Sequence, residues 1–399
     1  MEIHAAVSAD TIRHDFSPTG AVLDAVMRQF RLSRPPLTDL SPSYSRIDTV
    51  AGRRFAQVWF RTRGCTYDRR GECTMCNYGV GPDIEVPAMV GYVHDALDEL
   101  VGPIDELYVS PSGNLLDPME VPKEALDGIL VELRRHPAPR VAFETRPETV
   151  SARRLAAVSE ALGGKPFAVG LGVESVNPWV QRFCINKPLR EQQVASAIEV
   201  IHSVGAAAYV NVAIGSAFLN SYEATADAEQ STKWALGAGA DTVLLFPLHV
   251  KPFTLLEWMW RHGSYTPPSL WTLVEVLNRL PDRALGSVNV SWYRHDYGDA
   301  NILASPTSCP TCDGLVMAGL DAFRASPGRP ALDQLLGIAC CRDDQSPSAS
   351  IDLRPLPERV LGTLLDICEE FGIDAAQYAD AMATELRADQ SWHRITRRS

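Results

Sequence analysis

The stretch RGCTYDRRGECTMCNYG, residues 63–79, places three cysteines in a C-x7-C-x2-C spacing: Cys65, Cys73 and Cys76. It follows directly on the apolar run FAQVWF (residues 55–60), which is typical of a buried strand. A structural zinc site normally closes its tetrahedron with a fourth Cys or His, and no His lies nearby in the sequence. An iron–sulfur cluster held by three thiolates instead leaves one iron open to a substrate or cofactor. The spacing therefore favours a cluster; the alternatives are a zinc knuckle completed by a distant ligand, or loop cysteines without a metal.

Further short apolar runs follow this strand and alternate with longer amphipathic segments. This pattern predicts parallel strands joined by crossover helices. The expected strands are residues 55–60, 107–110, 141–144, 167–173, 209–214 and 242–247. The expected helices are residues 86–100, 123–135, 152–161, 190–203, 222–236 and 268–280. Most of these strands end in a polar or glycine-rich tip, such as SPSGN, ETRPE and GVES, and α/β folds build their sites at such ends. The pattern alone is compatible with an open sheet or with a partial barrel.

The composition argues against several classes of protein. The 399 residues include 37 Lys and Arg against 49 Asp and Glu, a formal net charge of −12, so a stand-alone nucleic-acid surface is not expected. With 46% hydrophobic and 22% charged residues, the chain is of ordinary globular type. No apolar run of about 18 residues and no apolar leader are visible, so we expect a cytoplasmic protein without a membrane span. Of the nine cysteines, Cys184 and Cys368 are expected to be buried small residues.

The cysteine loop and the strand tips together resemble the radical S-adenosylmethionine superfamily, whose usual cysteine motif has x3 where this chain has x7. The wider spacing is similar to a known variant. Within the superfamily the chain is most similar to the elongator-like branch, and especially to the radical subunit of archaeosine synthase and its bacterial relatives. The resemblance runs through SPSGNLLDPMEVP, FETRPETV, GVESVNPWVQRFCINKPL, VNVAIGSAFL and TLLEWMWRHGSYTPPSLW. It covers roughly residues 55–325 and implies an α/β fold, a partial (β/α)6 barrel.

The resemblance implies two cofactors. A [4Fe–4S] cluster would be bound by Cys65, Cys73 and Cys76, and S-adenosylmethionine would chelate the fourth iron. Reductive cleavage of the sulfonium bond then gives a 5′-deoxyadenosyl radical that abstracts hydrogen from the substrate. The electron implies a reductant of the flavodoxin or ferredoxin type. The cofactor supplies this chemistry, and the protein positions it and excludes side reactions.

Site residues carry over from the same resemblance. The residues that it assigns to S-adenosylmethionine are Met75, Ser112, Gly113, Asn114, Glu144, Arg146, Glu174 and Gly215. The catalytic candidates are Glu174, Lys187 and His249, which stand at or just beyond the ends of expected strands. Asn114 and Arg146 have structural alternatives, as a turn cap and as the partner of Glu148. For Lys187, a solvated surface charge is as good an interpretation as a substrate ligand. For His249, the alternative to a proton donor is a structural histidine.

A second cysteine group lies downstream of the expected barrel. The segment SCPTCDG places Cys309 and Cys312 in C-x2-C spacing, and Cys340 and Cys341 follow after a helical stretch, residues 314–338. Two pairs can form a four-thiolate site for structural zinc or for an auxiliary iron–sulfur cluster; the third alternative is no metal. An auxiliary cluster could relay electrons or donate sulfur, as related sulfur-inserting enzymes are understood to do. If the second site holds structural zinc and no second cluster, the expected reaction is a cleavage, a rearrangement or a dehydrogenation.

Three functions remain open for a chain that we divide into an N-terminal extension (1–50), a barrel (51–280) and a C-terminal domain (281–399). The acidic balance favours hydrogen abstraction from a small molecule, a nucleoside or another natural-product intermediate, with sulfur insertion if a second cluster is present. The rival is modification of a 7-deazaguanine base in transfer RNA with a partner subunit. Such an activity needs a basic face, and the candidates are few: Arg53, Arg54, Arg61 and Arg63 near the cysteine loop, and HRITRRS (residues 393–399). The third reading is a zinc-stabilised binding module without a redox role.

Overall fold

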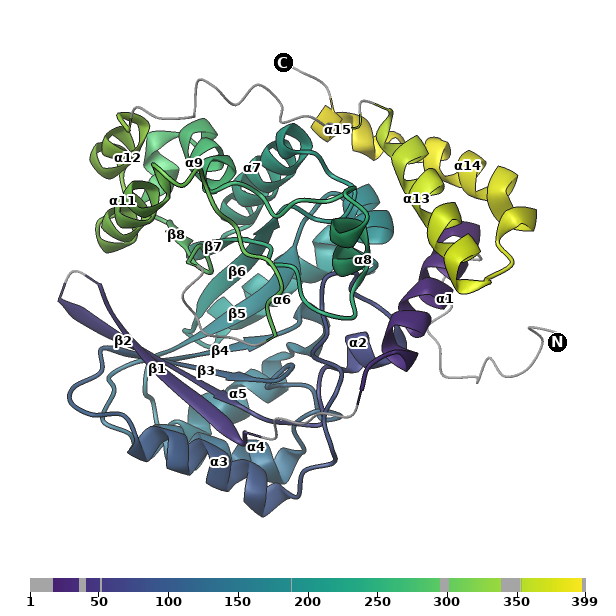
Figure 1. The fold of residues 1–399 in the computed structure, drawn as a ribbon. Helices are drawn as coiled ribbons and strands as arrows, with labels where there is room; N and C mark the ends of the chain where they lie inside the picture. Colours follow the sequence, from purple (N-terminus) through teal and green to yellow (C-terminus); the bar gives the residue numbers. More distant parts are fainter. Residues whose placement is uncertain are drawn as a thin grey trace.

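The structure, a computed structural model, describes residues 17–35, 41–50, 52–187, 189–294, 301–338, 352 and 354–396. Its centre is one eight-stranded sheet in the order β1 to β8 (Figure 1). The strands are β1 Ser43–Val50, β2 Arg53–Phe60, β3 Glu106–Pro111, β4 Val141–Thr145, β5 Phe167–Glu174, β6 Ala207–Ile214, β7 Thr242–Pro247 and β8 Val288–Val290. Strands β2 to β8 are parallel, and β1 is antiparallel to β2. Within the described residues β1 does not pair with β8, so the curved sheet is an open half-barrel, and the predicted fold is confirmed.

The helices that connect the parallel strands pack against the sheet. They are α3 Val86–Asp98, α4 Lys123–Arg135, α5 Ala152–Ala161, α6 Glu191–Ser203, α7 Ser221–Gly237 and α9 Leu270–Arg279. Every expected strand and helix of the barrel is confirmed, and their ends differ from the expected ones by at most two residues. Local chemistry sets such ends: at the start of α7, the side chains of Asn220 and Glu223 each accept the other residue's backbone N–H, at 3.0 and 2.9 Å.

Helices from the two ends of the chain pack together beside the barrel (Figure 1). The helices outside the six crossover helices are α1 Pro18–Leu32, α2 Thr66–Arg70, α8 Leu255–Arg261, α10 Asp282–Leu285, α11 Asp313–Ala325, α12 Arg329–Leu336, α13 Leu356–Phe371, α14 Ala379–Ala388 and α15 His393–Thr396. The rings of Phe30 in α1 and Phe371 in α13 meet edge to face at 5.3 Å. Glu385 in α14 accepts the backbone N–H of Thr19 at 2.9 Å. The N-terminal helix is therefore attached to the C-terminal helices.

The half-barrel takes strands from all three expected segments of the chain. Strand β1 comes from residues 1–50 and β8 from residues 281–399, and both pair with barrel strands. The division of the chain at residues 50 and 280 stays a prediction. Among the described residues, we find no helix with the length and apolar character needed to cross a membrane.

Candidate functional site

The three cysteines of the C-x7-C-x2-C loop directly follow β2, at the C-terminal edge of the parallel sheet. A hydrogen bond from the backbone N–H of Cys65 to the carbonyl of Tyr78 (3.0 Å) closes the base of the loop. The backbone N–H of Cys76 bonds to the carbonyl of Cys73 at 3.2 Å, and Cys73 itself has a left-handed φ of 58°. The loop thus gathers three thiols at the edge of the sheet where α/β folds build their sites.

Burial disfavours the ionised form of all three thiols. It raises the pKa of Cys65 to about 12 and that of Cys76 to about 11. For Cys73, burial and then the neighbouring Cys76 thiol raise the pKa well above its ordinary value. Thiolates bind iron, so protons must leave these thiols when a metal binds.

Each thiol also has at least one cation near it that acts in the opposite direction and lowers the thiol pKa. Arg146 acts on Cys65, Lys187 acts on Cys73, and Lys251 and then Lys187 act on Cys76. The three cations lie beyond the ends of three different strands, β4, β5 and β7. A positive charge next to a thiol favours the thiolate, the form that coordinates metals.

A second segment supports the cysteine loop from the side. It is the π-helix Val180–Ile185, a rare element that is frequent at functional sites. The backbone N–H of Cys73 donates to the carbonyl of Asn186 at 3.3 Å, and that of Thr74 donates to the carbonyl of Ile185 at 2.9 Å. The Thr74 hydroxyl donates to the carbonyl of Cys184 at 2.6 Å, while the Cys184 side chain is fully buried, as expected of a small core residue. The conformation around Cys73 is therefore set by backbone groups far away in the sequence.

Arg146, at the tip of β4, is held by three carboxylates. Its Nη1 donates to Glu120 at 2.9 Å, its Nε to Glu148 at 2.6 Å, and its Nη2 to Asp117. The same Nη1 lies 3.8 Å from the Sγ of Cys65. The pair with Glu148 exists, but it is one part of a larger network that joins the β4 tip to the cysteine loop.

Glu120 is the centre of that network, and the sequence analysis did not single it out. The buried carboxylate accepts the backbone N–H of Thr66 at 2.8 Å and the Asn114 side-chain amide at 3.1 Å. A Cβ at Gly113 would overlap Glu120 Oε2 and lie 3.3 Å from the Cα of Cys65. Gly113 thus permits the close approach of the SPSGN tip to the loop. The available signal was the pair of carboxylates in the same motif, SPSGNLLDPMEVP, which also contains Asp117.

Three residues that the resemblance assigns to S-adenosylmethionine have structural contacts. The Ser112 hydroxyl accepts the backbone N–H of Thr62 at 2.8 Å and so joins the ends of β2 and β3. Met75 is buried within the cysteine loop. Gly215 follows β6 with a φ of 90°, and its carbonyl accepts the Tyr265 hydroxyl at 2.8 Å. Their part in cofactor binding stays a prediction.

Glu144 lies inside the half-barrel. It accepts from the Ser110 hydroxyl on β3 at 2.9 Å and from the Asn211 amide on β6 at 2.6 Å. The contact between β4 and β6 crosses β5, where Gly170 leaves room beside the Glu144 side chain. The Tyr108 hydroxyl on β3 is close enough to both Glu144 and Asn211 for side-chain hydrogen bonds to affect the pKa of Tyr108. The interior between these strands therefore contains a carboxylate with polar neighbours on β3 and β6.

Glu174 and Lys187 form a buried ion pair at the end of β5. The Lys187 ammonium donates to Glu174 Oε2 and to the carbonyl of Gly172, each at 2.6 Å. Burial disfavours the ammonium, but the Glu174 carboxylate and the Cys73 thiol outweigh burial, and the pKa of Lys187 is raised. Glu174 has a left-handed φ of 64°, next to an irregularity in the pairing of β5 with β6. Lys187 is thus buried at the site and is not a surface charge.

His249, after β7, has both ring nitrogens engaged. Nε2 lies 2.7 Å from the carbonyl of Trp292 and Nδ1 lies 3.1 Å from the hydroxyl of Ser305. These contacts are those of a structural histidine, and its catalytic role stays a prediction. Lys251, two residues on, was not singled out from the sequence. Its ammonium lies 3.7 Å from the centre of the Tyr78 ring and bonds to the Tyr78 hydroxyl.

The second cysteine group is described only in part. The Sγ atoms of Cys309 and Cys312 are 3.2 Å apart, so the C-x2-C pair can present two thiols to one metal. Cys340 and Cys341 lie outside the described residues. The expected four-thiolate site stays a prediction.

The residues of the cysteine loop fit an iron–sulfur cluster. Three thiols share one loop, and the Asn114 amide and Arg146 guanidinium lie 3.7 and 3.8 Å from the Sγ of Cys65. Donors near sulfur are among the groups that tune cluster sites. Within the described part of the chain, no three His, Cys, Asp or Glu side chains are placed to hold one metal ion together. In a cluster, each thiolate binds an iron of its own.

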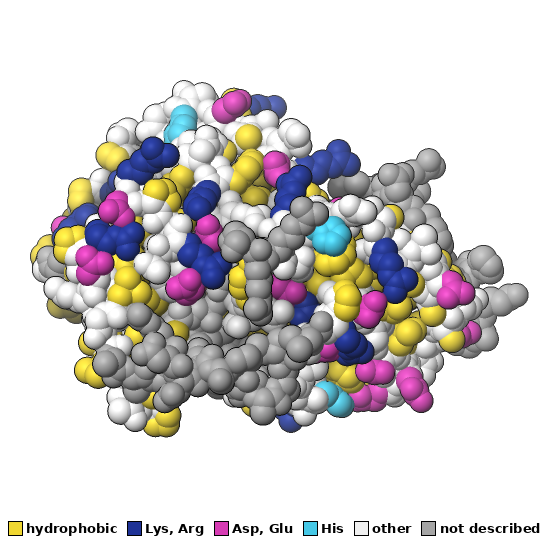
Figure 2. Space-filling view, turned by 90° about the horizontal axis from the view of Figure 1, so that it is seen from above, with side chains coloured by type: hydrophobic (Ala, Val, Ile, Leu, Met, Phe, Trp, Pro, Cys, Tyr) yellow, Lys and Arg dark blue, Asp and Glu magenta, His cyan; other side chains and the backbone are white. Residues whose placement is uncertain are grey.

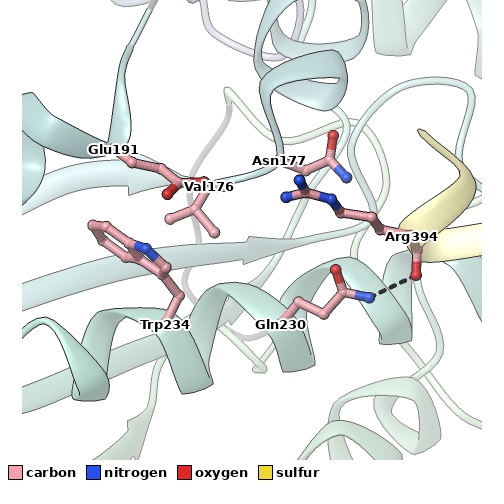
Figure 3. Close-up of a pocket in the computed structure, with 6 residues that line it drawn as sticks. All are labelled: Val176, Asn177, Glu191, Gln230, Trp234 and Arg394. Atoms are coloured by element: carbon pink, nitrogen blue, oxygen red, sulfur yellow. Dashed lines mark hydrogen bonds between the residues drawn. The ribbon is translucent and has the colours of Figure 1, made fainter. Parts of the chain in front are cut away.

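A separate cavity of about 150 Å³ lies between α6, α7 and α15 (Figure 3). It is lined by Val176, Asn177, Glu191, Gln230, Trp234 and Arg394. The Gln230 amide donates to the backbone carbonyl of Arg394 at 2.7 Å and so joins α7 to α15. No residue that the sequence analysis assigned to the site lines this cavity.

Two curated proteins similar to this chain carry the same name. Archaeosine synthase subunit beta of Methanosarcina acetivorans is 29% identical over 315 residues, 76% of this chain and 88% of that protein. The protein of that name from Thermococcus kodakarensis is 28% identical over 270 residues, 65% of this chain and 78% of that protein. The predicted resemblance to archaeosine synthase is thereby confirmed. A comparison with models of known protein families gives no match.

Solved structures with a similar arrangement have low sequence identity. Methylornithine synthase has a TM-score of 0.42 and 12% identity, covering 78% of this chain and 90% of that one. Elp3 of Methanocaldococcus infernus has a TM-score of 0.43 and 16% identity, covering 61% and 60%. Queuine lyase of Clostridium spiroforme, solved with S-adenosylmethionine and queuine bound, has a TM-score of 0.39 and 16% identity, covering 52% and 80%.

Proposed function

We propose that this chain is a radical S-adenosylmethionine enzyme whose [4Fe–4S] cluster is bound by Cys65, Cys73 and Cys76. The observation that carries the proposal is the gathering of three thiols, with three cations near them, at the C-terminal edge of a parallel half-barrel. When bound, the cluster and S-adenosylmethionine supply a carbon radical that abstracts hydrogen from a substrate. The reducing electron comes from a flavodoxin or ferredoxin.

The chain's own residues hold and orient these groups. Arg146 fixes the cluster loop through Glu120 and Asp117, and its charge favours the thiolate of Cys65. Inside the barrel, Glu144 offers a carboxylate that can accept from sugar hydroxyls, as the resemblance suggests. The Glu174–Lys187 pair lies at the end of β5 with its ammonium near the Cys73 thiol, where it can orient cofactor or substrate.

For the substrate, we propose a small molecule of nucleoside type or another biosynthetic intermediate. The net charge of −12 disfavours phosphate-rich partners. Figure 2 shows acidic and basic side chains interspersed on the viewed face, without a continuous basic surface among the described residues. Of the basic candidates near the loop, Arg61 is buried and Arg63 pairs with Asp83 at 3.4 Å.

The second candidate function is modification of a 7-deazaguanine base in transfer RNA. It is favoured by the similarity to two proteins named archaeosine synthase subunit beta, which extends over most of this chain. The word subunit in their name indicates a partner in those proteins. A partner of this chain would then supply the basic surface that binds the nucleic acid. Either substrate could receive sulfur if Cys309 and Cys312 belong to a second cluster.

The first test measures iron and acid-labile sulfide per chain after anaerobic reconstitution. It compares the wild type with the triple variant Cys65→Ala/Cys73→Ala/Cys76→Ala. Roughly four irons falling to none, with zinc retained, would indicate one radical-generating cluster and a structural C-terminal site. Roughly eight falling to four would indicate a second cluster and favour sulfur insertion. A wild type without iron would contradict the proposal and leave the zinc-stabilised binding module.

The second test separates the two substrate classes. Binding of transfer RNA is measured at two salt concentrations, with and without added proteins from the same cells. Nucleic-acid binding driven by phosphate contacts weakens steeply with salt. No binding under either condition, together with formation of 5′-deoxyadenosine in the presence of a free nucleoside, supports the small-molecule function. Salt-sensitive binding that requires an added protein supports the second candidate.

A further inference from the structure

Arg34 lies outside the barrel, two residues beyond α1, and its side chain reaches into the cysteine loop. Its Nη1 donates to Asp68 Oδ2 at 2.7 Å and its Nη2 to Asp68 Oδ1 at 2.8 Å. Both side chains are almost completely buried, with 5% and 1% exposed. Two parallel N–H···O bonds of this kind fix the guanidinium and the carboxylate in one relative orientation.

This ion pair bonds to both ends of the cysteine loop, the part that follows Cys65 and the part around Cys76. Asp68 stands in α2, three residues after Cys65, and it also accepts the backbone N–H of Gly79, which follows Cys76 by three residues. The Arg34 Nη2 donates in addition to the backbone carbonyl of Cys76 at 3.3 Å. The Arg34 guanidinium therefore connects the part of the loop that follows Cys65, through Asp68, with the backbone of Cys76.

The N-terminal helix contacts the other support of the loop as well. The side-chain amide of Asn186 donates to Asp24 in α1 at 3.0 Å and to the carbonyl of Gly71 at 3.0 Å. The backbone carbonyl of the same Asn186 accepts from Cys73. The backbone N–H of Asp68 bonds in turn to the thiol of Cys65. The segment around α1 thus reaches all three cysteines through one or two hydrogen bonds, although it contributes no thiol itself.

We propose that Arg34 is a positioning residue for the cluster, acting through Asp68 and the carbonyl of Cys76. The inference rests on the proposed function, in which the three thiols bind a cluster. It gives the N-terminal extension a role in cofactor retention, since this segment closes the loop from outside the barrel. Partners beyond the direct ligands typically change metal affinity by about 10- to 100-fold when they are replaced.

The test uses Arg34→Met, which removes the charge and keeps much of the side-chain volume. Removing one member of a buried pair also destabilises the fold, so a matched control is needed. Arg359→Met breaks another buried pair, in which Arg359 Nη2 donates to Glu223 at 2.5 and 2.6 Å, between α13 and α7. The double variant Arg34→Met/Asp68→Asn removes both members of the pair. It also takes the carboxylate from Arg31, whose Nε lies 3.9 Å from Asp68 Oδ1, so its fold is expected to be less perturbed than in the single variant but not equal to wild type, while the link across the loop is still lost.

The readouts are the rate of iron loss to a chelator, the electron paramagnetic resonance spectrum of the reduced protein, and the unfolding midpoint without iron. We expect iron loss to be about tenfold faster in Arg34→Met and in the double variant, with an altered spectrum, and unchanged in Arg359→Met. Equal iron loss in wild type and both Arg34 variants would overturn the inference while leaving the proposed function in place. Equal acceleration in Arg359→Met would also overturn it, since stability alone would then explain the loss. A wild type that binds no iron would refute the proposed function and the inference together.

Discussion

The Nη1 of Arg146 lies 3.8 Å from the Sγ of Cys65. Arg146 is one of the three cations near the thiols, and it differs from the two lysines in its partners. Lys187 pairs with one carboxylate and Lys251 with a tyrosine hydroxyl, whereas Arg146 bonds to three carboxylates. The guanidinium therefore both compensates thiolate charge and ties the β4 tip to the loop.

Replacing Arg146 should separate these two roles. Arg146→Met removes the charge and all three ion pairs, and we expect about tenfold faster iron loss together with a lower unfolding midpoint. Arg146→Lys keeps the charge but lacks the planar fork that reaches several carboxylates at once, so iron loss should be intermediate. Iron release to a chelator and thermal unfolding are measured on each variant. Iron retention equal to wild type in Arg146→Met would contradict the role assigned to this contact.

Much of the barrel could be predicted because its strands and helices have strong local patterns. Strand β5 reads FAVGLGVE, and six of its eight residues are buried, as expected where helices cover a parallel strand. Strand β1, SYSRIDTV, has no fully buried residue and mixes polar with apolar positions, so its pattern gave no signal. Its place in the sheet follows from antiparallel pairing with β2, a tertiary contact.

The site was predictable where chemistry lies in one short motif. The three cysteines could be identified from their spacing, and Arg146 and Glu174 from their places at strand tips. Arg34 could not, because it reaches Asp68 across 34 positions of sequence. Hydrogen-bond networks of this kind depend on distances in the folded chain, which no local pattern records.

A side chain at Gly113 is expected to destabilise the protein. In Gly113→Ala the new Cβ would overlap the buried Glu120 carboxylate, which bonds to Thr66 beside Cys65. Displacing a packed, hydrogen-bonded group typically costs about 1–3 kcal/mol, so both the unfolding free energy and iron retention should fall. The control is Gly91→Ala in α3, where a Cβ meets no atom within 4 Å. That change should stabilise the protein by about 0.5–1 kcal/mol, because alanine is the better helix former. Equal effects of the two substitutions would contradict the crowding at Gly113.

Because of Asp227, the stability of the folded protein should decrease as the pH rises from acid to neutral. Burial in α7 raises its pKa from 3.8 to about 7, and the Ser175 hydroxyl donates to it at 2.8 Å. Below about pH 4 the carboxyl is protonated in both the folded and the unfolded chain, and from there to about pH 7 only the folded chain holds the proton. The stabilising contribution is therefore complete at acid pH and is lost as the pH rises through the folded-state pKa.

Asp227→Asn should remove this pH dependence, because the amide is neutral throughout and still accepts from Ser175. Relative to wild type, its unfolding midpoint should rise between about pH 4 and pH 8. Asp241→Asn is the control of opposite sign, since the backbone N–H of Ala208 and the side chain of His202 outweigh partial burial and lower the pKa of Asp241. Replacing the Asp241 carboxylate should lower the unfolding midpoint at neutral pH and change it little at acid pH. A midpoint difference for Asp227→Asn that does not change with pH would refute the assignment.

Substitutions of Glu174 and Lys187 should have non-additive effects on stability, and the two single substitutions should differ in their effects on iron retention. Either single change, Lys187→Met or Glu174→Gln, leaves one buried member without its partner, and the double variant leaves neither. We therefore expect the double variant to be more stable than the sum of the single effects indicates, with an interaction energy of about 1–3 kcal/mol. The charge of Lys187 lowers the pKa of Cys73 and the charge of Glu174 raises it. Lys187→Met should therefore lose iron faster, Glu174→Gln should hold it at least as well as wild type, and the double variant should lie between them. Thermal unfolding without iron gives the coupling, and chelator-driven release gives the iron retention. If Glu174→Gln loses iron as fast as Lys187→Met, the pair acts as one structural unit and the specific role of the Lys187 charge is wrong.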